Sequence, residues 1–331
     1  MVKKKILKEI RVENAIGYTL AHDLTRIVPG EFKGRAFKKG HIIREEDILE
    51  LLNIGKEHIF VMALQEGYLH EDEAANRLAK AIAGQNTTMN EPHEGKVTLT
   101  STIYGLAKIH EKYVHQINQI PDIALATIMD NRIVQPGSKL AGTRALPLII
   151  EERFVEEVEK LTQRKIVVEV KPFIPHQVGF VTTGSEVFKG RIKDQFKPIV
   201  EAKLESFGST LVEQRFVPDE IDWIQKEILY FIDKKVDLIL VSGGMSVDPD
   251  DRTPFAIRGI ATEVITQGTP MLPGSMLMLA YIGDIPVLGL PGGVLHDPYT
   301  AFDAVLPRVL AKETITKDEI TRLGYGGYFG C

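Results

Sequence analysis

The stretch from Leu238 to Asp251 constrains the fold more than any other part of the chain. It opens with Leu-Ile-Leu-Val, an apolar run without alternation that is typical of a strand buried on both faces of a parallel sheet. Gly243 and Gly244 follow, and without a Cβ they permit a sharp turn and a close approach to backbone N–H groups. A hydroxyl and three carboxylates come next. This order predicts a ligand site at the carboxyl end of a strand. The alternative is an ordinary strand-to-helix turn whose aspartates cap the next helix.

Composition bounds the class of protein. A length of 331 residues predicts two or three domains. The formal net charge of -5 and the lack of a strongly basic region argue against nucleic acid as a partner. The one cysteine, Cys331, offers no disulfide framework within a chain, which fits a reducing cytoplasm. We find no signal peptide and no apolar run long enough to span a bilayer, so we expect a cytoplasmic protein without a membrane partner.

The first half of the chain predicts two smaller domains. Residues 1–66 predict a β-rich N-terminal domain with one short helix over 45–53. Residues 67–175 predict an α+β middle or linker domain, with an amphipathic helix over 71–83, a polar loop over 85–95 and a mostly helical stretch over 101–118. Arg144 is expected in a small-residue turn, where it would hold an anion or form a structural ion pair.

Strands and helices alternate over residues 176–312, which is typical of a parallel sheet with helices on both faces. We expect strands over 178–183, 210–217 and 237–241, and a hairpin over 276–290, with Asp219 as the N-cap of a helix over 221–233. Residues 313–331 are expected to form a C-terminal tail with a mobile end. The predicted fold class is α/β: a three-layer αβα domain with a mostly parallel sheet, preceded by the β-rich domain and the α+β segment.

Polar groups follow four strands of residues 176–312, and we expect them to converge on one edge of the sheet. Backbone N–H groups and hydroxyls there favour an anion such as phosphate, and nearby carboxylates favour Mg²⁺. The residues concerned are Thr183, Gly184, Ser185, Glu186, Asp219, Gly243, Gly244, Ser246, Asp248, Asp250, Asp251, Pro291, Gly292 and Gly293.

This region resembles the molybdopterin-binding domain of molybdenum-cofactor biosynthesis proteins, namely the molybdopterin molybdenumtransferases and their adenylyltransferase relatives. The resemblance rests on Thr-Thr-Gly-Ser-Glu-Val at 182–187, the strand and acidic loop at 237–251, and Val-Leu-Gly-Leu-Pro-Gly-Gly at 287–293. More loosely, Ala-Ile-Gly-Tyr-Thr-Leu-Ala-His-Asp at 15–23 and Phe-Lys-Gly-Arg-Ala-Phe-Lys-Lys-Gly at 32–40 resemble the first domain of the molybdenumtransferase type. The chain resembles a short form of that type that lacks the C-terminal domain.

The resemblance implies transfer of molybdate onto adenylylated molybdopterin, with Mg²⁺ and release of AMP. Gly243, Gly244 and Ser246 match the loop that receives the pterin phosphate. The catalytic residues that it implies are Asp251, Glu186 and Asp219, and the metal ligands are Asp248, Asp250 and Asp251. It also implies a homodimer, and as partners other molybdenum-cofactor biosynthesis proteins or a recipient molybdoenzyme.

Three departures from the family pattern leave the activity open. Asp248 replaces a glycine, Ser275 replaces a lysine, and Gly293 replaces an asparagine. The lost side chains favour a non-catalytic carrier or sensor that binds molybdopterin, whereas the retained Glu186, Asp219 and Asp251 favour an enzyme. A third, weaker alternative is a pyridine-nucleotide amidohydrolase, because some of those enzymes carry a related domain.

Overall fold

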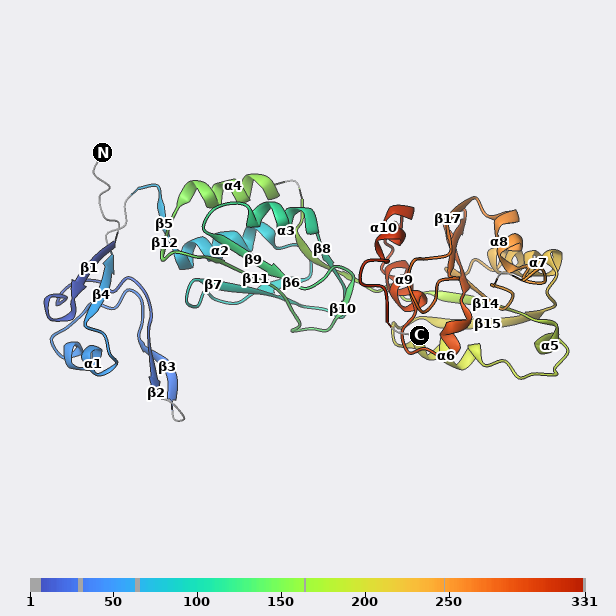
Figure 1. Cartoon of the computed structure of the whole chain (residues 1–331), viewed down its shortest axis with the longest axis horizontal. Coiled ribbons are helices and arrows are strands. Elements are labelled where there is room, and N and C mark those ends of the chain that lie inside the picture. The colour runs from blue at the N-terminus through green and yellow to red at the C-terminus, as the bar shows by residue number, and fades with distance from the viewer. Residues whose placement is uncertain (1–6, 29–31, 63–65, 164, 247, 330–331) are drawn as a thin grey trace. The chain divides into compact units, whose positions relative to one another are not determined.

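The computed structural model describes residues 7–28, 32–62, 66–163, 165–246 and 248–329 (Figure 1). Two compact units make up the chain, Met1–Val170 and Lys171–Cys331. Cys331, on which the prediction of a reducing compartment rests, lies outside the described residues. Across the described part of the chain, we find no helix with the length and apolarity needed to cross a membrane.

The beginning of the first unit is β-rich, as predicted. Strand β1 (Leu7–Arg11) pairs antiparallel with β4 (His58–Met62), and β2 (Leu24–Val28) pairs with β3 (Phe32–Phe37). A 3-10 turn, η1 (Val12–Asn14), and a short helix, α1 (Asp47–Asn53), complete this part. Its core consists of Val12, Ala15, Leu20, Leu24, Phe37, Ile43, Leu51, Ile59 and Val61.

The rest of the first unit packs the predicted amphipathic helix, α2 (Glu71–Ile82), against an antiparallel sheet. The sheet has the order β6-β7-β11-β9, with β6 (Thr87–Met89), β7 (Lys96–Ser101), β11 (Lys139–Ala145) and β9 (Ile123–Thr127). All five apolar residues that share a face of α2 are buried: Ala74, Ala75, Leu78, Ala79 and Ile82. Around them lie β5 (Tyr68–His70) with β12 (Ile149–Glu151), the sheet β10-β8-β13 (Arg132–Val134, Gly105–Ile109, Val168–Pro172), α3 (Glu111–Asn118) and α4 (Glu152–Thr162).

Three local predictions in this unit are wrong. The stretch 101–118 is not mostly helical, because it contains the end of β7, the whole of β8 and only then α3. The polar segment 85–95 contains β6, and Arg144 lies within β11 instead of a turn. In each case pairing with a distant strand decides the local structure, which overrides the apolar spacing and the small residues on which the predictions relied.

The second unit is built on a six-stranded sheet with the order β15-β14-β16-β19-β18-β17. The strands are β15 (Thr210–Val217), β14 (Gln177–Thr183), β16 (Leu238–Ser242), β19 (Ile285–Leu290), β18 (Met278–Ile282) and β17 (Glu263–Gln267). From β15 to β19 neighbouring strands are parallel, and the hairpin β18–β19 and the edge strand β17 are antiparallel. The mostly parallel sheet agrees with the prediction.

Helices bury both faces of this sheet. In β16, Leu238 and Leu240 pack in one core with α6 (Phe196–Glu205), α9 (Ala301–Leu310) and α10 (Lys317–Arg322). Ile239 and Val241 pack in a second core with α7 (Ile221–Asp233) and α8 (Thr253–Ile260). Because alternate residues of one strand enter different cores, the uninterrupted apolar run has a structural reason. The three-layer αβα domain is confirmed.

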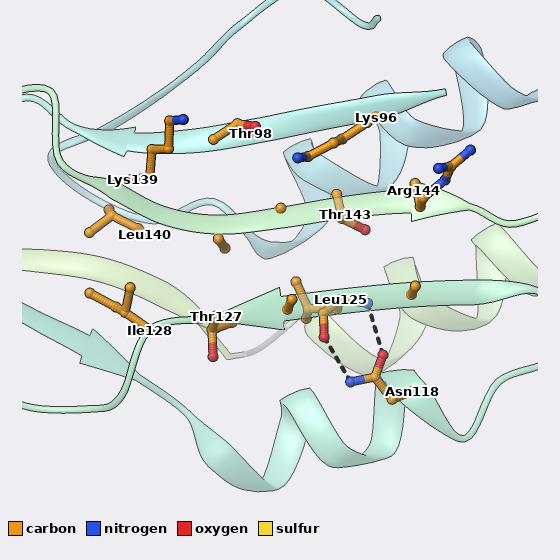
Figure 2. A pocket seen from close by; sticks show the side chains of 14 residues that line it. Lys96, Thr98, Asn118, Leu125, Thr127, Ile128, Lys139, Leu140, Thr143 and Arg144 are labelled. Atoms are coloured by element: carbon orange, nitrogen blue, oxygen red, sulfur yellow. Dashed lines mark hydrogen bonds between the residues drawn. The ribbon is translucent and has the colours of Figure 1, made fainter. Parts of the chain in front are cut away.

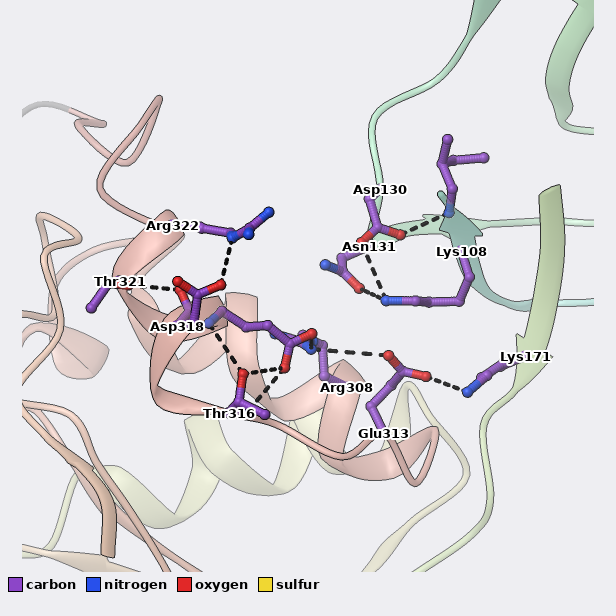
Figure 3. Close-up of polar contacts among 12 residues, drawn as sticks. Lys108, Asp130, Asn131, Lys171, Arg308, Glu313, Thr316, Asp318, Thr321 and Arg322 are labelled. Atoms are coloured by element: carbon purple, nitrogen blue, oxygen red, sulfur yellow. Dashed lines mark hydrogen bonds and ion pairs between the residues drawn. The ribbon is translucent and has the colours of Figure 1, made fainter. Parts of the chain in front are cut away.

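Residues 313–331, which were expected to form a C-terminal tail with a mobile end, contain a helix that the sequence did not predict, α10 (Lys317–Arg322). Helix α10 starts with a capping box between Thr316 and Glu319. Arg308 of α9 is only 2% exposed and forms ion pairs with Glu319 at 2.8 Å and Glu313 at 3.9 Å (Figure 3). The backbone of Leu272 then exchanges hydrogen bonds with residues 327 and 329, so the end of the described chain is held against the domain.

Candidate functional site

The carboxyl ends of four parallel strands meet at one edge of the sheet in the second unit. Thr183 of β14 pairs in register with Val217 of β15, and Thr182 with Ser242 of β16, which in turn pairs with Leu290 of β19. The segments predicted to carry the site follow directly after these strand ends. The topology therefore brings Thr183, Asp219, Gly243 and Pro291 to neighbouring loops of one sheet edge.

Asp219 joins two of these loops. One carboxylate oxygen accepts a hydrogen bond from the Thr183 hydroxyl at 3.0 Å, and the other accepts one from the backbone N–H of Ser185 at 2.9 Å. The prediction that Asp219 caps α7 is wrong, because the N-cap residue is Glu220. The carboxylate of Asp219 instead contacts the end of the neighbouring strand β14. There it holds the turn that begins at Gly184 and leads into the short helix α5 (Ser185–Phe188).

Gly243 and Gly244 have positive φ angles of 87° and 53°. A Cβ on Gly243 would lie 2.2 Å from the carbonyl oxygen of Thr183, so only glycine fits between these two strand ends. The buried hydroxyl of Thr253, at the start of α8, donates to the Gly243 carbonyl at 2.7 Å and lies 3.4 Å from the Thr183 hydroxyl. Polar contacts thus link Asp219, Thr183, Thr253 and Gly243 across the edge.

The loop after β16 presents backbone donors. Within the described residues, the N–H groups of Gly244, Met245 and Ser246 donate to no protein acceptor. The side chain of Ser246 is exposed and adds a hydroxyl to the same loop. Unpaired N–H groups in a glycine-containing turn after a strand form a concave donor surface that suits an anion. This arrangement agrees with the chemistry on which the phosphate prediction was based.

The acidic part of the loop is closed on itself. Asp251 accepts a hydrogen bond from the N–H of Asp248 at 3.0 Å and donates its own N–H to the Asp248 carbonyl at 2.9 Å. The side chains of Asp248, Asp250 and Glu186 are exposed. Among the residues that the structure describes, no group of three or more Asp, Glu, His or Cys side chains is arranged to hold a metal ion. The Mg²⁺ role of Asp248, Asp250 and Asp251 rests on the resemblance alone and stays a prediction.

The loop after β19 begins with a buried proline, Pro291, and continues as a short 3-10 helix, η2 (Gly292–Leu295). A Cβ on Gly293 would lie 3.1 Å from a carboxylate oxygen of Asp297 and 3.7 Å from the Cβ of Pro273. Around Gly292 a Cβ would meet no protein atom within 4 Å. The Gly293 loop therefore lies against the segment Pro273–Ser275, so two of the departures from the family pattern are neighbours.

Two features of this edge were missed by sequence reasoning. Thr253 is fully buried and holds the glycine loop, and its only sequence signal is a hydroxyl residue directly before Pro254 at the start of a helix. Phe188 and Trp223 lie with ring centroids 6.4 Å apart, and each is more than 40% exposed. Their separation in sequence gives no hint of this contact, which follows from the adjacency of β14 and β15.

Family models match two parts of the chain. Residues 179–311 match a family described as a probable molybdopterin binding domain, and residues 9–63 match a family described as a domain of unknown function. The predicted resemblance of the second unit to the molybdopterin-binding domain is confirmed by the first match.

Relatives in molybdenum-cofactor biosynthesis share the same region. Two proteins named molybdopterin molybdenumtransferase, from Staphylococcus aureus (strain COL) and Bacillus subtilis (strain 168), are 27% identical over 134 residues and 28% identical over 122 residues. These alignments cover 38% and 35% of this chain and 31% and 28% of the relatives. The chain thus spans about a third of the length of the curated relatives it matches.

Solved structures with similarity to this chain include two proteins named for molybdopterin biosynthesis. MoaB from Thermus thermophilus is 25% identical, with a TM-score of 0.36, and the match covers 42% of this chain and 98% of that one. The Mog protein from Mycobacterium ulcerans is 21% identical, with a TM-score of 0.36, and the match covers 41% of this chain and 97% of that one.

Proposed function

We propose that the carboxyl edge of the six-stranded sheet binds the phosphate of molybdopterin and that the chain acts in molybdenum-cofactor biosynthesis. One observation carries the proposal: the unpaired N–H groups of Gly244, Met245 and Ser246 lie between the ends of β14 and β19, within the domain that matches the molybdopterin-binding family. Donors that need no rearrangement favour an anion at this position. Gly292, with open space around its Cα, lets a ligand approach the neighbouring loop.

The reaction proposed for this site is molybdate insertion into adenylylated molybdopterin. Water attacks the pterin phosphorus, the phosphoanhydride bond breaks, and AMP leaves. The two dithiolene thiols bond to the molybdenum of molybdate, and one molybdate oxygen leaves as water with the two thiol protons. Asp219 keeps the turn at Ser185 in place, and Asp251 keeps the acidic loop closed, so both residues would position the groups that contact the ligand. No step of this reaction is assigned to Mg²⁺, because the described residues include no group of three or more Asp, Glu, His or Cys side chains that could hold the ion.

A second function is favoured by one specific observation. The segments in which Ser275 and Gly293 replace the family's lysine and asparagine lie together, so the charge and the amide are missing from the same side of the site. A protein that binds molybdopterin there without inserting molybdenum would be a carrier or sensor. The two functions share the phosphate site and differ in turnover.

Binding and turnover can be measured separately on the purified full chain. Molybdopterin binding is followed by the fluorescence of oxidised pterin retained on the protein, and insertion by AMP release that depends on added molybdate. Gly292→Ala should keep the thermal stability of the chain and weaken pterin binding at least tenfold, since its Cβ meets only space that the ligand would use. Gly283→Ala, in the β18–β19 turn, is the matched control and should bind normally.

The variant Asp251→Asn distinguishes the enzyme function from the carrier function, because asparagine still accepts the hydrogen bond from the Asp248 N–H but carries no charge. If the negative charge of Asp251 takes part in molybdate insertion, the Asp251→Asn variant should bind the pterin normally and lose AMP release. Molybdate-dependent release at the rate of the unchanged protein would refute the role of Asp251. If the unchanged protein binds molybdopterin tightly but releases no AMP, the carrier or sensor function remains. If Gly292→Ala binds molybdopterin as tightly as Gly283→Ala does, the proposed phosphate site is refuted.

A further inference from the structure

Two cationic residues occupy opposite positions on neighbouring strands of the sheet in the first unit. In the antiparallel pair β7–β11, Arg144 lies directly opposite Lys96. A Cβ on Gly142, two residues from Arg144, would lie 3.3 Å from the Cε of Lys96, so the lysine side chain extends over β11. Like charges directly opposite in a sheet are destabilising. The pair therefore costs stability unless an anion lies between the two groups.

Protein carboxylates offset this charge only in part. Arg144 donates to the backbone carbonyl of Glu94 at 3.3 Å and lies 3.9 Å from the carboxylate of Glu71. In the described part of the chain, neither Lys96 nor Lys139 has a carboxylate within 4 Å. Arg144 thus forms the structural ion pair that its sequence context left open, but two further cations on the same face keep their charge uncompensated.

These cations line a groove of about 550 Å³ on the sheet face (Figure 2). Helix α2 packs against β7 and β11, and along β7 the buried residues Val97 and Leu99 alternate with the groove residues Lys96 and Thr98. The floor of the groove is made of small side chains, since Gly142 pairs with Thr98 on one side and Ala126 on the other. Arg144 likewise pairs with Ala124. A volume of this size is typical of small-molecule sites.

The groove suits neither a nucleic acid nor an added peptide strand. None of the residues that line it is aromatic, so it offers no platform on which bases could stack. At the edge strand β9, the side chain of Asn118 accepts the N–H of Leu125 and donates to its carbonyl, each at 2.8 Å (Figure 2). The backbone groups of Leu125, in the middle of this edge strand, are therefore already occupied and cannot pair with an extended peptide.

We propose that this sheet face binds a phosphorylated small organic molecule of about nucleotide size, with its phosphate between Lys96 and Arg144. The small, apolar floor over Gly142 and Ala126 takes the organic part. Lys139 lies five residues from Arg144 along β11, roughly 17 Å at the rise of a strand. It can meet a second negative group at the far end. This site lies in the other unit from the molybdopterin edge and does not depend on the function proposed there.

The test is calorimetric titration of the full chain with inorganic phosphate, AMP and ADP. We expect the organic phosphates to bind more tightly than inorganic phosphate, and their affinity to fall as the salt concentration rises. Lys96→Gln and Arg144→Gln should each raise Kd at least tenfold. Lys80→Gln, which removes an exposed cation of α2 outside the groove, is the matched control and should leave Kd unchanged.

A stability measurement gives a second readout that does not depend on the choice of ligand. In the absence of phosphate, Lys96→Gln should unfold at a higher temperature than the unchanged protein, because the substitution removes the repulsion between Lys96 and Arg144. Added phosphate should reduce the difference between the two unfolding temperatures. Binding that survives in both groove variants but is lost in Gly292→Ala would place the anion in the second unit and overturn the proposal. No binding of any of the three probes at millimolar concentration, or binding of an acidic protein alone, would also overturn it.

Discussion

Gly243→Ala tests whether the glycine loop is held as tightly as its contacts indicate. The φ of Gly243 is 87°, and an added Cβ would lie 2.2 Å from the Thr183 carbonyl oxygen, where real Cβ contacts essentially never fall below 3.0 Å. Either the loop or the end of β14 must move by at least 0.8 Å, the difference between these distances (3.0 − 2.2). Neither can move alone, because Thr183 and Gly243 are both linked to Thr253.

The magnitude follows from two costs. A non-glycine residue in the left-handed region costs about 1–2 kcal/mol, and overpacking at a well-packed position costs about 1–3 kcal/mol. We therefore expect Gly243→Ala to lower the free energy of unfolding of the second unit by about 2–5 kcal/mol. Gly283→Ala shares the positive φ, at 60°, but its Cβ would meet nothing within 4 Å. It should cost only the first part, about 1–2 kcal/mol.

The assay is urea unfolding followed by tryptophan fluorescence. The chain has one tryptophan, Trp223 in α7, so the signal reports on the second unit alone. The difference between the two alanine variants isolates the contact with Thr183 from the backbone strain that both share. If Gly243→Ala and Gly283→Ala unfold at the same urea concentration, the loop is free to move aside and does not form a rigid donor surface.

Two further predictions concern stability. His70 is buried, and one of its ring nitrogens forms a hydrogen bond with the Ala21 carbonyl oxygen. Burial lowers the pKa of His70 in the folded state, so below pH about 6.5 the unfolded state binds a proton at this residue more readily than the folded state does. Calorimetry should show the first unit losing stability as the pH falls from 7.5 to 5.5, less steeply in His70→Gln, while the similarly lowered pKa of His22 keeps part of the slope. Gly179→Ala would place a Cβ 2.5 Å from the Phe231 ring and should cost about 1–3 kcal/mol in urea unfolding, with Phe231→Leu restoring part of the loss; additive effects would contradict the contact.

Elements with a strong local period were predictable, and those defined by distant pairing were not. Helix α2 follows from apolar residues at helical spacing, and β16 from an apolar run between turn signals. Strand β8 and helix α3 share one stretch in which residues such as Leu106 and Ile109 suit either structure. The pairing of β8 with β10, more than twenty residues away, decides between them, and no local pattern carries that information.

The same distinction applies within the candidate site. A parallel sheet places the carboxyl ends of its strands at one edge, so polar residues after each strand were expected to meet there, and they do. Which group each residue contacts was not predictable. Asp219 suits a helix cap as well as a bond to the next loop, and only the position of Ser185 after the neighbouring strand decides. The separate orientations of Asp248, Asp250 and Asp251 were equally hidden, because a run of aspartates looks the same whether or not the side chains converge.

The two proposed anion sites differ in how far the sequence predicts them. The donors of the loop after β16 are indicated by Gly243 and Gly244, because glycines without a Cβ let a ligand approach the backbone N–H groups closely. The groove in the first unit has no such signal, since Lys96 and Arg144 lie far apart in sequence and become neighbours only through the register of β7 with β11. An antiparallel sheet tolerates opposed cations at a cost, and a chain that keeps them on an open face gains when an anion relieves that cost. Stability without ligand and affinity for the ligand are therefore linked at the groove, so Lys96→Gln should weaken binding and stabilise the fold.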